Sequence, residues 1–403
     1  MTAPHERRVV VIGGGPAGLM AASVLAMRAQ VVLYEQGRNV GRKFLVAGDG
    51  GLNITNSAAG DALLAHFSPT DRMRPILEAF DPTALRNWLA SLGVPTFTGT
   101  SGRVFPQRGI KPAEVLKAIV EQVLGRGVVI HSGCTFVGFN AERRPTMERD
   151  GERIIPEADA YLFALGGASW PKTGSTGAWV DAFKKMGVDV RAFEASNCGV
   201  EVDLPPSLLP HVGKPLKNVA TRCGAKSVRG EITITEHGLE GNAIYPLIPA
   251  VRGQLASSHE AKITIDLKPD LTVERIEEKL RDAAWKERSS VLRLDRPALA
   301  FLKAFTPVER YLDGRTLAHD VKNVQVPIQA LRPIEEAIST SGGISWDALN
   351  DDLALRDHPH IFVAGEMIDW DAPTGGFLLQ GAFSTGSWAA NGILAKLGLA
   401  EEV

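Results

Sequence analysis

Apolar positions near the start of the chain follow the pattern of a β-α-β unit. Residues 7–12 are mostly β-branched and lie between a charged start and glycines, which is typical of a buried parallel strand. A helix over about 16–28 and a second strand over 31–34 complete the unit. The alternation continues with helices near 82–92 and 111–124 and with apolar strands at 128–131 and 160–164. This order predicts an α/β domain with a parallel sheet.

The pattern changes after about residue 193, where short strands such as 231–235 are separated by Pro and Gly. Residues 268–320 then carry apolar side chains at three-to-four spacing, which predicts a small helical insert. Apolar strands return at 324–328 and 360–364, and a glycine-rich loop and a final helix follow. We therefore predict an α/β domain (1–193 and 344–403), an inserted β domain (194–267 and 321–343) and a helical subdomain (268–320).

Length and composition describe a globular chain without a strong net charge. The 403 residues predict about two to three domains at the usual 100–200 residues each. With 44% apolar and 22% charged residues the chain can bury a sizeable core, which excludes a disordered protein. The net charge of −2 comes from 44 basic and 46 acidic residues, so no global field draws the chain to nucleic acid or anionic lipid.

The cysteines and the N-terminal segment bear on the cellular compartment. The cysteines are Cys134, Cys198 and Cys223. They lie far apart and form neither a CxxC pair nor a zinc-spaced cluster, so we expect no metal site, and this usage fits a reducing cytoplasm. Arg7 and Arg8 precede an uncharged run that imitates an export signal, but residues 13–16 (Gly-Gly-Gly-Pro) divide that run. We expect a cytoplasmic protein without a membrane-spanning segment.

A glycine-rich turn follows the first predicted strand and opens the first predicted helix. Its pattern is Gly13-x-Gly15-x-x-Gly18, in which the glycines permit a tight turn and a close approach of the backbone to a pyrophosphate. The N-terminus of the helix favours an anion at this place. Glu35 ends the second strand, where a carboxylate can accept hydrogen bonds from both ribose hydroxyls of an adenosine. Together these features predict a dinucleotide site.

Segments at both ends of the chain favour FAD over NAD. Residues 41–56 begin with Gly-Arg-Lys and continue as a loop rich in Gly and Asn, which we predict in place of the regular next helix of an NAD domain. Such a loop can lie along a large planar ligand, and an ordinary surface turn is the alternative. Near the end of the chain, Glu366 follows a strand and residues 373–377 open the last helix. This carboxylate can bind a ribityl chain, and the helix N-terminus can face the pyrimidine edge of a flavin.

Three segments carry a resemblance to a known family. They are a GRK, Gly-rich loop and N-x-TN segment at 41–56, a GG-x-S-x-P-x-TGSTG segment at 166–177, and a GE-x₈-GG-x-x-x-Q segment at 365–380. With these segments the chain resembles the bacterial BaiN/RdsA-type NAD(P)/FAD-dependent oxidoreductases, also called the aminoacetone-oxidase-like FAD family. The resemblance implies a glutathione-reductase-like Rossmann FAD-binding domain, interrupted by a β-barrel-like domain that contains a helical subdomain.

The sequence departs from the family pattern at three places that flank the expected flavin site. Gly51-Leu52 stands in place of Arg-Cys, Phe377-Leu378 in place of Tyr-Asn, and Ala178-Trp179 in place of Asp-Gly. FAD binding is therefore carried over from the family, and the substrate is not. The residues expected to bind FAD are Gly13, Gly15, Pro16, Ala17, Gly18, Glu35, Gln36, Arg42, Lys43, Gly48, Asn53, Ala164, Gly166, Gly365, Glu366, Gly375, Gly376, Phe377 and Leu378.

The expected reaction is hydride transfer between FAD and an unidentified acceptor, most simply a small molecule. No second GxGxxG with a ribose-binding acid appears in the sequence, so NADH or NADPH would dock transiently as electron donor. Asp369 and Asp371 are candidate catalytic residues that could hold a proton relay or cap a loop. Cys198 could face the substrate or be a buried structural thiol.

A basic stripe suggests another kind of partner. Its five residues, with no acid among them, are Lys214, Lys217, Arg222, Lys226 and Arg229. One branch of the resembling family reduces a uridine in ribosomal RNA, so the stripe could bind RNA, while a solvated surface is the simpler interpretation. Two alternatives to a small-molecule enzyme therefore stay open. They are flavin-dependent reduction of an RNA base to dihydrouridine, and a non-enzymatic flavin module for electron transfer or sensing.

Overall fold

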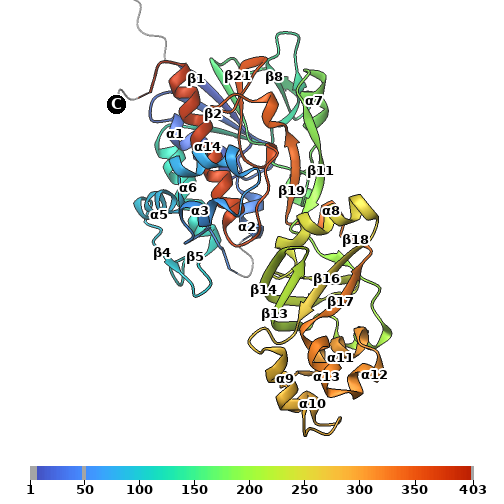
Figure 1. Cartoon of the computed structure of the whole chain (residues 1–403). Coiled ribbons are helices and arrows are strands. Elements are labelled where there is room, and N and C mark those ends of the chain that lie inside the picture. Colours follow the sequence, from blue (N-terminus) through green and yellow to red (C-terminus); the bar gives the residue numbers. More distant parts are fainter. Residues whose placement is uncertain (1–6, 48–50, 401–403) are drawn as a thin grey trace, which may run out of the picture. The chain divides into compact units, whose positions relative to one another are not determined.

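A computed structural model describes residues 7–47 and 51–400 of the chain. The chain divides into two compact units (Figure 1). Unit 1 contains the residues up to Glu194 and those from Ser339 onward, and unit 2 contains residues 195–338. The chain thus leaves unit 1 once and returns to it once. Unit 2 is therefore an insertion into a domain that both ends of the chain build.

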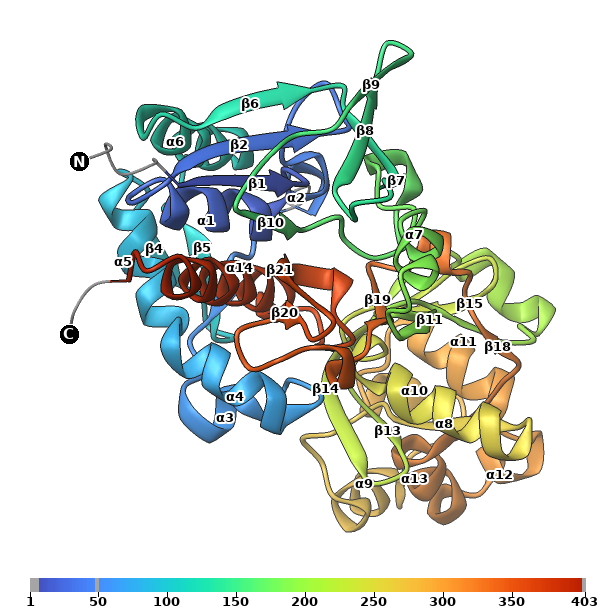
Figure 2. The same ribbon diagram turned by 90° about the horizontal axis from the view of Figure 1, so that it is seen from above.

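The central sheet of unit 1 has six strands in the order β20-β21-β10-β1-β2-β6 (Figure 2). Neighbouring strands are parallel except for β20 and β21. In the middle of the sheet Val10 lies opposite Tyr161 on one side and Val32 on the other, and β1 is buried from its second residue onward. A strand that is buried on both faces needs no polar alternation, which explains its β-branched run. The strands are β1 (Arg8–Ile12), β2 (Gln30–Glu35), β6 (Val129–Ser132), β10 (Ala160–Phe163), β20 (Ala354–Leu355) and β21 (His358–Val363).

Small residues allow two helices of unit 1 to approach each other closely. A Cβ atom added to Gly386 in α14 would lie 2.3 Å from the carbonyl oxygen of Ala17 in α1, so any side chain there would force the helices apart. The hydroxyl of Ser23 in α1 donates to the amide oxygen of Gln122 in α6, and the guanidinium of Arg126, directly after α6, donates to the carbonyl of Ser23. The helices are α1 (Pro16–Leu25), α2 (Arg42–Ala47), α3 (Gly60–Leu64), α4 (Thr70–Ala79), α5 (Pro82–Ser91), α6 (Pro112–Gly125), α7 (Val180–Lys185) and α14 (Phe377–Lys396).

Three smaller sheets complete unit 1 and the place where the insertion begins and ends. One has the order β3-β5-β4, another has the order β7-β8-β9, and β11 pairs with β19 where the chain leaves and re-enters unit 1. The strands are β3 (Thr55–Asn56), β4 (Thr96–Thr98), β5 (Arg103–Pro106), β7 (Thr135–Phe139), β8 (Pro145–Arg149), β9 (Glu152–Ile154), β11 (Val190–Ser196) and β19 (Ser339–Ile344).

Unit 2 is a seven-stranded sheet with helices that share its core. The strand order is β17-β16-β13-β14-β15-β12-β18. The two edge strands of this sheet, β17 and β18, are neighbours in sequence, because Gln329 alone separates them. The strands are β12 (Val200–Glu201), β13 (Pro215–Cys223), β14 (Lys226–Ile234), β15 (Gly238–Glu240), β16 (Ala261–Asp266), β17 (Val324–Ile328) and β18 (Ala330–Leu331).

The helical segment of unit 2 packs its apolar side chains into the same core as the sheet. Ile276, Phe301 and Leu317 from this segment are fully buried together with Ile263 and Ile232 from the strands. One shared core explains why residues 195–338 form a single compact unit. The helices are α8 (Ile248–Ser258), α9 (Val273–Leu280), α10 (Arg288–Val291), α11 (Arg296–Phe305), α12 (Val308–Leu312) and α13 (Gly314–Lys322).

The segment that we predict in place of a regular helix contains the short helix α2, which covers Arg42–Ala47 and ends where the predicted glycine-rich loop begins. The N–H of Gly41 donates to the carbonyl of Gly14 at 2.8 Å, and the N–H of Leu45 donates to the carbonyl of Gly41 at 3.1 Å. Phe44 is buried in the core of unit 1. Burial of this ring stabilises a single helical turn that the local sequence alone would not hold. Among the helices of the described residues, none is long and apolar enough to cross a membrane.

Candidate functional site

The turn between β1 and α1 leaves open space in front of the helix. A Cβ on Gly13 would lie 2.3 Å from the carbonyl oxygen of Ala164, and one on Gly18 would lie 1.9 Å from that of Gly13, so both positions require glycine. At Gly15, by contrast, an added Cβ would meet no described atom within 4 Å. Pro16 starts α1, and no side chain of the described residues caps the helix. This arrangement leaves the positive end of α1 facing a space in which an anion fits.

Glu35 is fixed at the end of β2 by the same turn. One carboxylate oxygen accepts from the N–H of Gly14 at 2.7 Å, and the other accepts from the N–H of Gly37 at 2.6 Å. Each carboxylate oxygen has two lone pairs, so the group can still accept from ribose hydroxyls. The next residue, Gln36, donates to the carbonyl of Gly174 at 2.7 Å and so joins the TGSTG segment to this edge of the sheet. The structure therefore places Glu35 against the turn between β1 and α1, and Gln36 against the TGSTG segment.

Lys43 and Glu366 form the centre of a network that joins distant segments of unit 1. The Lys43 ammonium donates to Glu366 at 2.7 Å and to the hydroxyl of Ser169 at 2.8 Å. The N–H of Gly167 donates to the same Glu366 oxygen as Lys43, at 3.4 Å, and the other oxygen accepts from the N–H of Thr340 at 3.0 Å. About a third of the Lys43 side chain and a fifth of the Glu366 side chain stay accessible (30% and 19%). Protein donors thus already engage both oxygens of Glu366, which the sequence assigns to a ribityl chain.

The neighbouring Arg42 also links the segment after β2 to the GG-x-S-x-P-x-TGSTG segment. Its guanidinium is exposed and donates to the carbonyl of Lys172 at 2.8 Å.

We expect Lys43→Met to destabilise unit 1 by about 1–3 kcal/mol, because Glu366 would keep its charge in a half-buried place without its cation. Adding Glu366→Gln to Lys43→Met should recover part of that loss, since the neutral amide needs no cation. Urea unfolding of the four variants in a double-mutant cycle measures the coupling, which we expect at about 0.5–3 kcal/mol. The exposed Lys172→Met is the matched control. A coupling of zero would mean that the ion pair contributes no stability.

The first turn of α14 packs on the short strand β3. A Cβ on Gly376, whose φ is +96°, would lie 2.3 Å from the carbonyl oxygen of Thr55. The amide of Asn56 donates to the carbonyl of Gly375 at 3.1 Å. Phe377 is buried, stacks on His66 with ring centroids 4.1 Å apart and meets Phe67 edge-on. These contacts fix the start of the helix, and Leu378 beside it is half-buried.

Buried polar atoms without a partner mark the places that a ligand can satisfy. Five buried side-chain polar atoms find no hydrogen-bond partner among the described residues, and three of them, Asn53 Oδ1, Ser175 Oγ and Ser341 Oγ, lie in unit 1. A buried polar atom of this kind costs about 1–3 kcal/mol unless it is paired. Asn53 belongs to the predicted flavin loop and Ser175 to the TGSTG segment, while Ser341 follows Thr340 of the Glu366 network. These atoms and the open space at Gly15 fit an extended polar cofactor such as FAD.

Other predicted cofactor residues meet around α1. Gly365 has a φ of +76°, and a Cβ there would lie 2.9 Å from the Cβ of Ala17. Ala164 contacts Gly13 as described above, and the carbonyl of Gly166 accepts from the indole of Trp179 at 2.9 Å. Gly48 lies outside the described residues. With that exception, the structure brings the predicted FAD-binding residues from three stretches of chain into one unit.

The candidate catalytic residues have different surroundings. Asp369 accepts from the guanidinium of Arg191 at 2.9 Å and from the N–H of Gly342 at 3.0 Å, so both of its oxygens are engaged. The backbone of Asp371 exchanges hydrogen bonds with Ser68. Cys198 lies in the hydrophobic core of unit 2 and is 2% exposed. This burial matches the structural alternative for the thiol, and none of the three residues is proposed below as catalytic.

One tyrosine near Cys198 has a strongly shifted pKa. Burial, followed by the nearby Glu240 carboxylate, raises the pKa of Tyr245 to about 12. The phenol therefore stays protonated throughout the neutral and mildly alkaline range.

The basic stripe lies on the β13–β14 hairpin of unit 2. All five of its side chains are exposed. Arg229 forms an ion pair with Asp270, which also accepts from the amide of Asn218 at 2.8 Å, and Arg222 donates to Asn323 at 3.4 Å. The stripe contains no acidic residue in sequence, but the fold brings Asp270 beside it. The local positive charge is therefore smaller than the sequence indicates.

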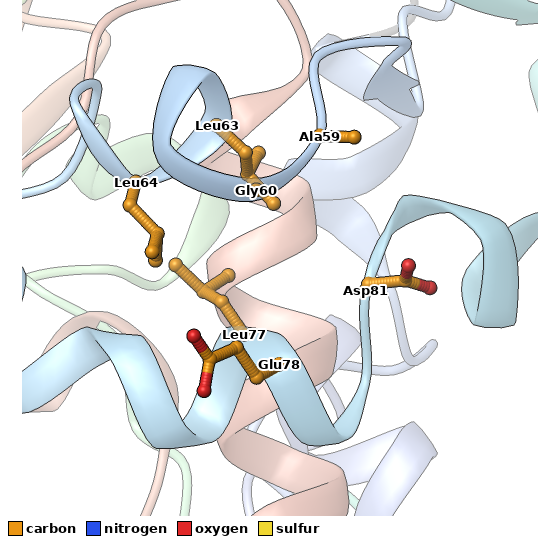
Figure 3. Close-up of a pocket in the computed structure, with 7 residues that line it drawn as sticks. All are labelled: Ala59, Gly60, Leu63, Leu64, Leu77, Glu78 and Asp81. Carbon is orange, nitrogen blue, oxygen red and sulfur yellow. The ribbon is translucent and has the colours of Figure 1, made fainter.

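A small pocket lies between α3, α4 and the start of α5 (Figure 3). Its volume is about 170 Å³, below the roughly 300–1,000 Å³ of typical ligand sites. Its lining includes Leu63, Leu77 and Glu78, and none of the residues that line it belongs to the predicted flavin site. Within residues 7–47 and 51–400, no group of three His, Cys, Asp or Glu side chains is placed to hold a metal ion.

Some residues of the site were not predicted. Ser169 and Thr340 complete the Glu366 network, and Arg103 lies beside the loop before α14. Ser169 stands within the GG-x-S segment, which was a usable signal. Thr340 and Arg103 stand in no motif, and only the pairing of β19 and β5 with their neighbours brings them to the site.

Comparison with known proteins now identifies the family. The model of the HI0933-like protein Rossmann domain matches residues 7–392. The chain belongs to this family. The resemblance and the Rossmann-type α/β fold predicted from the sequence are therefore confirmed, and so is the class of enzyme, an FAD-dependent oxidoreductase.

Relatives of this HI0933-like protein cover almost all of its length. It is 25% identical to a 3-dehydro-bile acid delta(4,6)-reductase of Clostridium scindens, over 94% of this chain and 97% of the relative. It is 21% identical to a ribosomal RNA dihydrouridine synthase of Escherichia coli, over 94% and 96%. Its fold is similar to that of a 3-ketosteroid delta1-dehydrogenase of Sterolibacterium denitrificans, with a TM-score of 0.54, 13% identity and coverage of 96% and 99%.

Proposed function

We propose that this protein reduces a carbon–carbon double bond conjugated to a ketone in a small acceptor, in the cytoplasm, with NADH or NADPH as transient electron donor. The full-length similarity to a 3-dehydro-bile acid delta(4,6)-reductase supports this class of acceptor. Such a reduction adds a hydride to the carbon β to the ketone and a proton to the α carbon. FAD, when bound and reduced by the nicotinamide donor, would supply that hydride from N5 of its ring.

The chain's own residues would hold the cofactor at defined points. The free N–H groups at the start of α1 would bind the pyrophosphate in the open space at Gly15. Glu35, held by Gly14 and Gly37, would accept from the ribose hydroxyls. The network of Lys43 and Glu366 would support the middle of the cofactor, and the start of α14 would lie at its ring. The observation that carries the proposal is this convergence of a glycine turn, an acid and a helix N-terminus in unit 1.

The test is an anaerobic reaction in two steps. FAD-loaded protein is mixed with NADH or NADPH, and we expect the visible flavin absorbance to bleach with one of them. A conjugated 3-keto steroid is then added and should restore the absorbance within one turnover, with a saturated product. The matched control is the same steroid without the conjugated double bond, which should restore nothing. If no conjugated ketone reoxidises the reduced protein faster than the saturated control, the proposal fails.

Reduction of an RNA base is a second candidate, supported by the exposed basic stripe on one hairpin and by the dihydrouridine synthase relatives. The double variant Lys217→Glu, Arg222→Glu should then weaken RNA binding by roughly tenfold or more. Each lost phosphate contact means that one counterion fewer is released from the RNA on binding, so the favourable entropy of binding falls. Lys184→Glu with Lys185→Glu in α7 is the matched control for net charge. Unchanged RNA binding and unchanged dihydrouridine content with the stripe variant would remove this candidate.

A further inference from the structure

The side chain of Arg103 lies at the site with no hydrogen-bond or ion-pair partner among the described residues. This residue is half-buried. In the β3–β5 pair it lies opposite Asn56, and its Nε is 3.9 Å from the place where a Cβ on Gly375 would stand. A guanidinium held at this depth gains stability when it meets a negative charge. The position beside Gly375 shows where such a charge would lie.

A second positive feature adjoins Arg103. The 20-residue helix α14 begins at Phe377, and neither an acidic side chain in its first turn nor a capping side chain of the described residues neutralises its N-terminus. Gly376 at the cap rests on the carbonyl of Thr55, in the strand that pairs with β5. The guanidinium and the helix N-terminus therefore flank the same loop, and both favour an anion.

A hydrogen-bond acceptor without a donor lies in the same cluster. The amide nitrogen of Asn53 donates to the carbonyls of Thr55 and Val104 at 2.8 and 3.2 Å, which fixes the side chain between β3 and β5. Its Oδ1 is buried and has no hydrogen-bond donor in the part of the chain that the structure describes. The cluster thus offers one fixed acceptor together with a cation and a helix N-terminus. The pyrimidine ring of a flavin carries the complementary set, with an N3–H donor beside the N1–C2=O edge that becomes negative on reduction.

We propose that Arg103, together with the N-terminus of α14, binds the N1–C2=O edge of the flavin and stabilises its anionic reduced form, with Asn53 accepting from N3–H. The inference rests on the proposed function only in placing FAD in unit 1. A carboxylate of the acceptor is the other anion that could occupy this place, and the experiment distinguishes the two.

Sulfite tests the charge at this edge without any acceptor. Its sulfur lone pair forms a bond to flavin N5, and the displaced electron pair moves onto N1–C2=O, where Arg103 would hold it. We expect Arg103→Gln to weaken sulfite binding by roughly tenfold or more and to lower the flavin midpoint potential correspondingly, at about 30 mV for a tenfold change in a two-electron couple. Arg103→Lys should keep most of both values, because the charge remains. Arg108→Gln, at an exposed arginine five residues further on, is the matched control.

The outcomes separate the possibilities. If Arg103→Gln binds sulfite as tightly as wild type and has the same flavin potential, the proposal is overturned. If that variant then shows only a raised KM for the acceptor, Arg103 binds the acceptor instead. If Arg103→Gln loses flavin while Arg103→Lys retains it, the positive charge at position 103 is required, as proposed. Loss of flavin from both variants would contradict a role of that charge. Sulfite binding needs no acceptor, so a wild-type protein that reduces no conjugated ketone would end the proposed function and leave this test readable.

Discussion

Replacing Gly15 with Ala should leave the protein folded and weaken its binding of FAD by roughly 100-fold, or about 2.8 kcal/mol. The backbone of Gly15 is extended, with φ −78° and ψ −177°, and tolerates alanine. An added Cβ meets no described atom within 4 Å, so unfolding should change by less than about 0.5 kcal/mol. The methyl group would instead stand where the pyrophosphate approaches the backbone. FAD titration by flavin fluorescence and thermal unfolding of the apoprotein measure the two effects.

Gly18→Ala gives the contrasting result from the same turn. Its Cβ would lie 1.9 Å from the carbonyl oxygen of Gly13, a backbone atom that cannot move aside, so we expect a loss of more than about 4 kcal/mol or no folded protein. Gly253→Ala in α8, where an added Cβ also meets nothing, is the control and should leave FAD affinity unchanged. Unchanged FAD affinity in Gly15→Ala would contradict the placement of the pyrophosphate at this turn.

The second large effect is expected at the contact between α1 and α14. Gly386→Ala should destabilise unit 1 by about 3 kcal/mol or more, because its Cβ would lie 2.3 Å from the Ala17 carbonyl oxygen and the helices must separate. Tryptophan fluorescence during urea unfolding reports mainly on unit 1, since Trp285 is the one tryptophan of the seven that lies in unit 2. Gly253→Ala should instead stabilise its helix by about 0.5–1 kcal/mol. A wild-type midpoint for Gly386→Ala would show that the two helices are not in backbone contact.

The sequence predicts the fold best where a local pattern and the tertiary structure agree. The β-branched run of β1 and the glycine turn before α1 needed no distant contact to be seen. The helix α2 was missed because its six residues gain stability from the burial of Phe44, which the local sequence does not reveal. The single core of unit 2 likewise depends on contacts between helices and strands that lie far apart in sequence.

The residues of the candidate site also fall into those that a local motif indicates and those that only the folded chain brings together. The residues that stand in motifs, such as Gly13, Glu35 and Lys43, could be proposed for the cofactor site because their chemistry depends on spacing within one segment. The carboxylate of Glu366 could be proposed in the same way, but its engagement by Thr340 and Lys43 depends on strands that meet only in the folded chain. Arg103 carried no signal, since an arginine in a short strand is usually a surface residue. Motifs therefore identify a class of cofactor, and the fold shows which further side chains surround it.

The central claim is that this chain holds one FAD in unit 1, and the absorbance spectrum of the purified protein tests it most directly. We expect a visible flavin spectrum, at one FAD per chain after incubation with the cofactor, and release of intact FAD on denaturation. Gly15→Ala prepared in parallel should lose this signal while its apoprotein stays folded. A wild-type protein that is colourless after incubation with FAD, and that leaves the fluorescence of added FAD unchanged, would contradict the account.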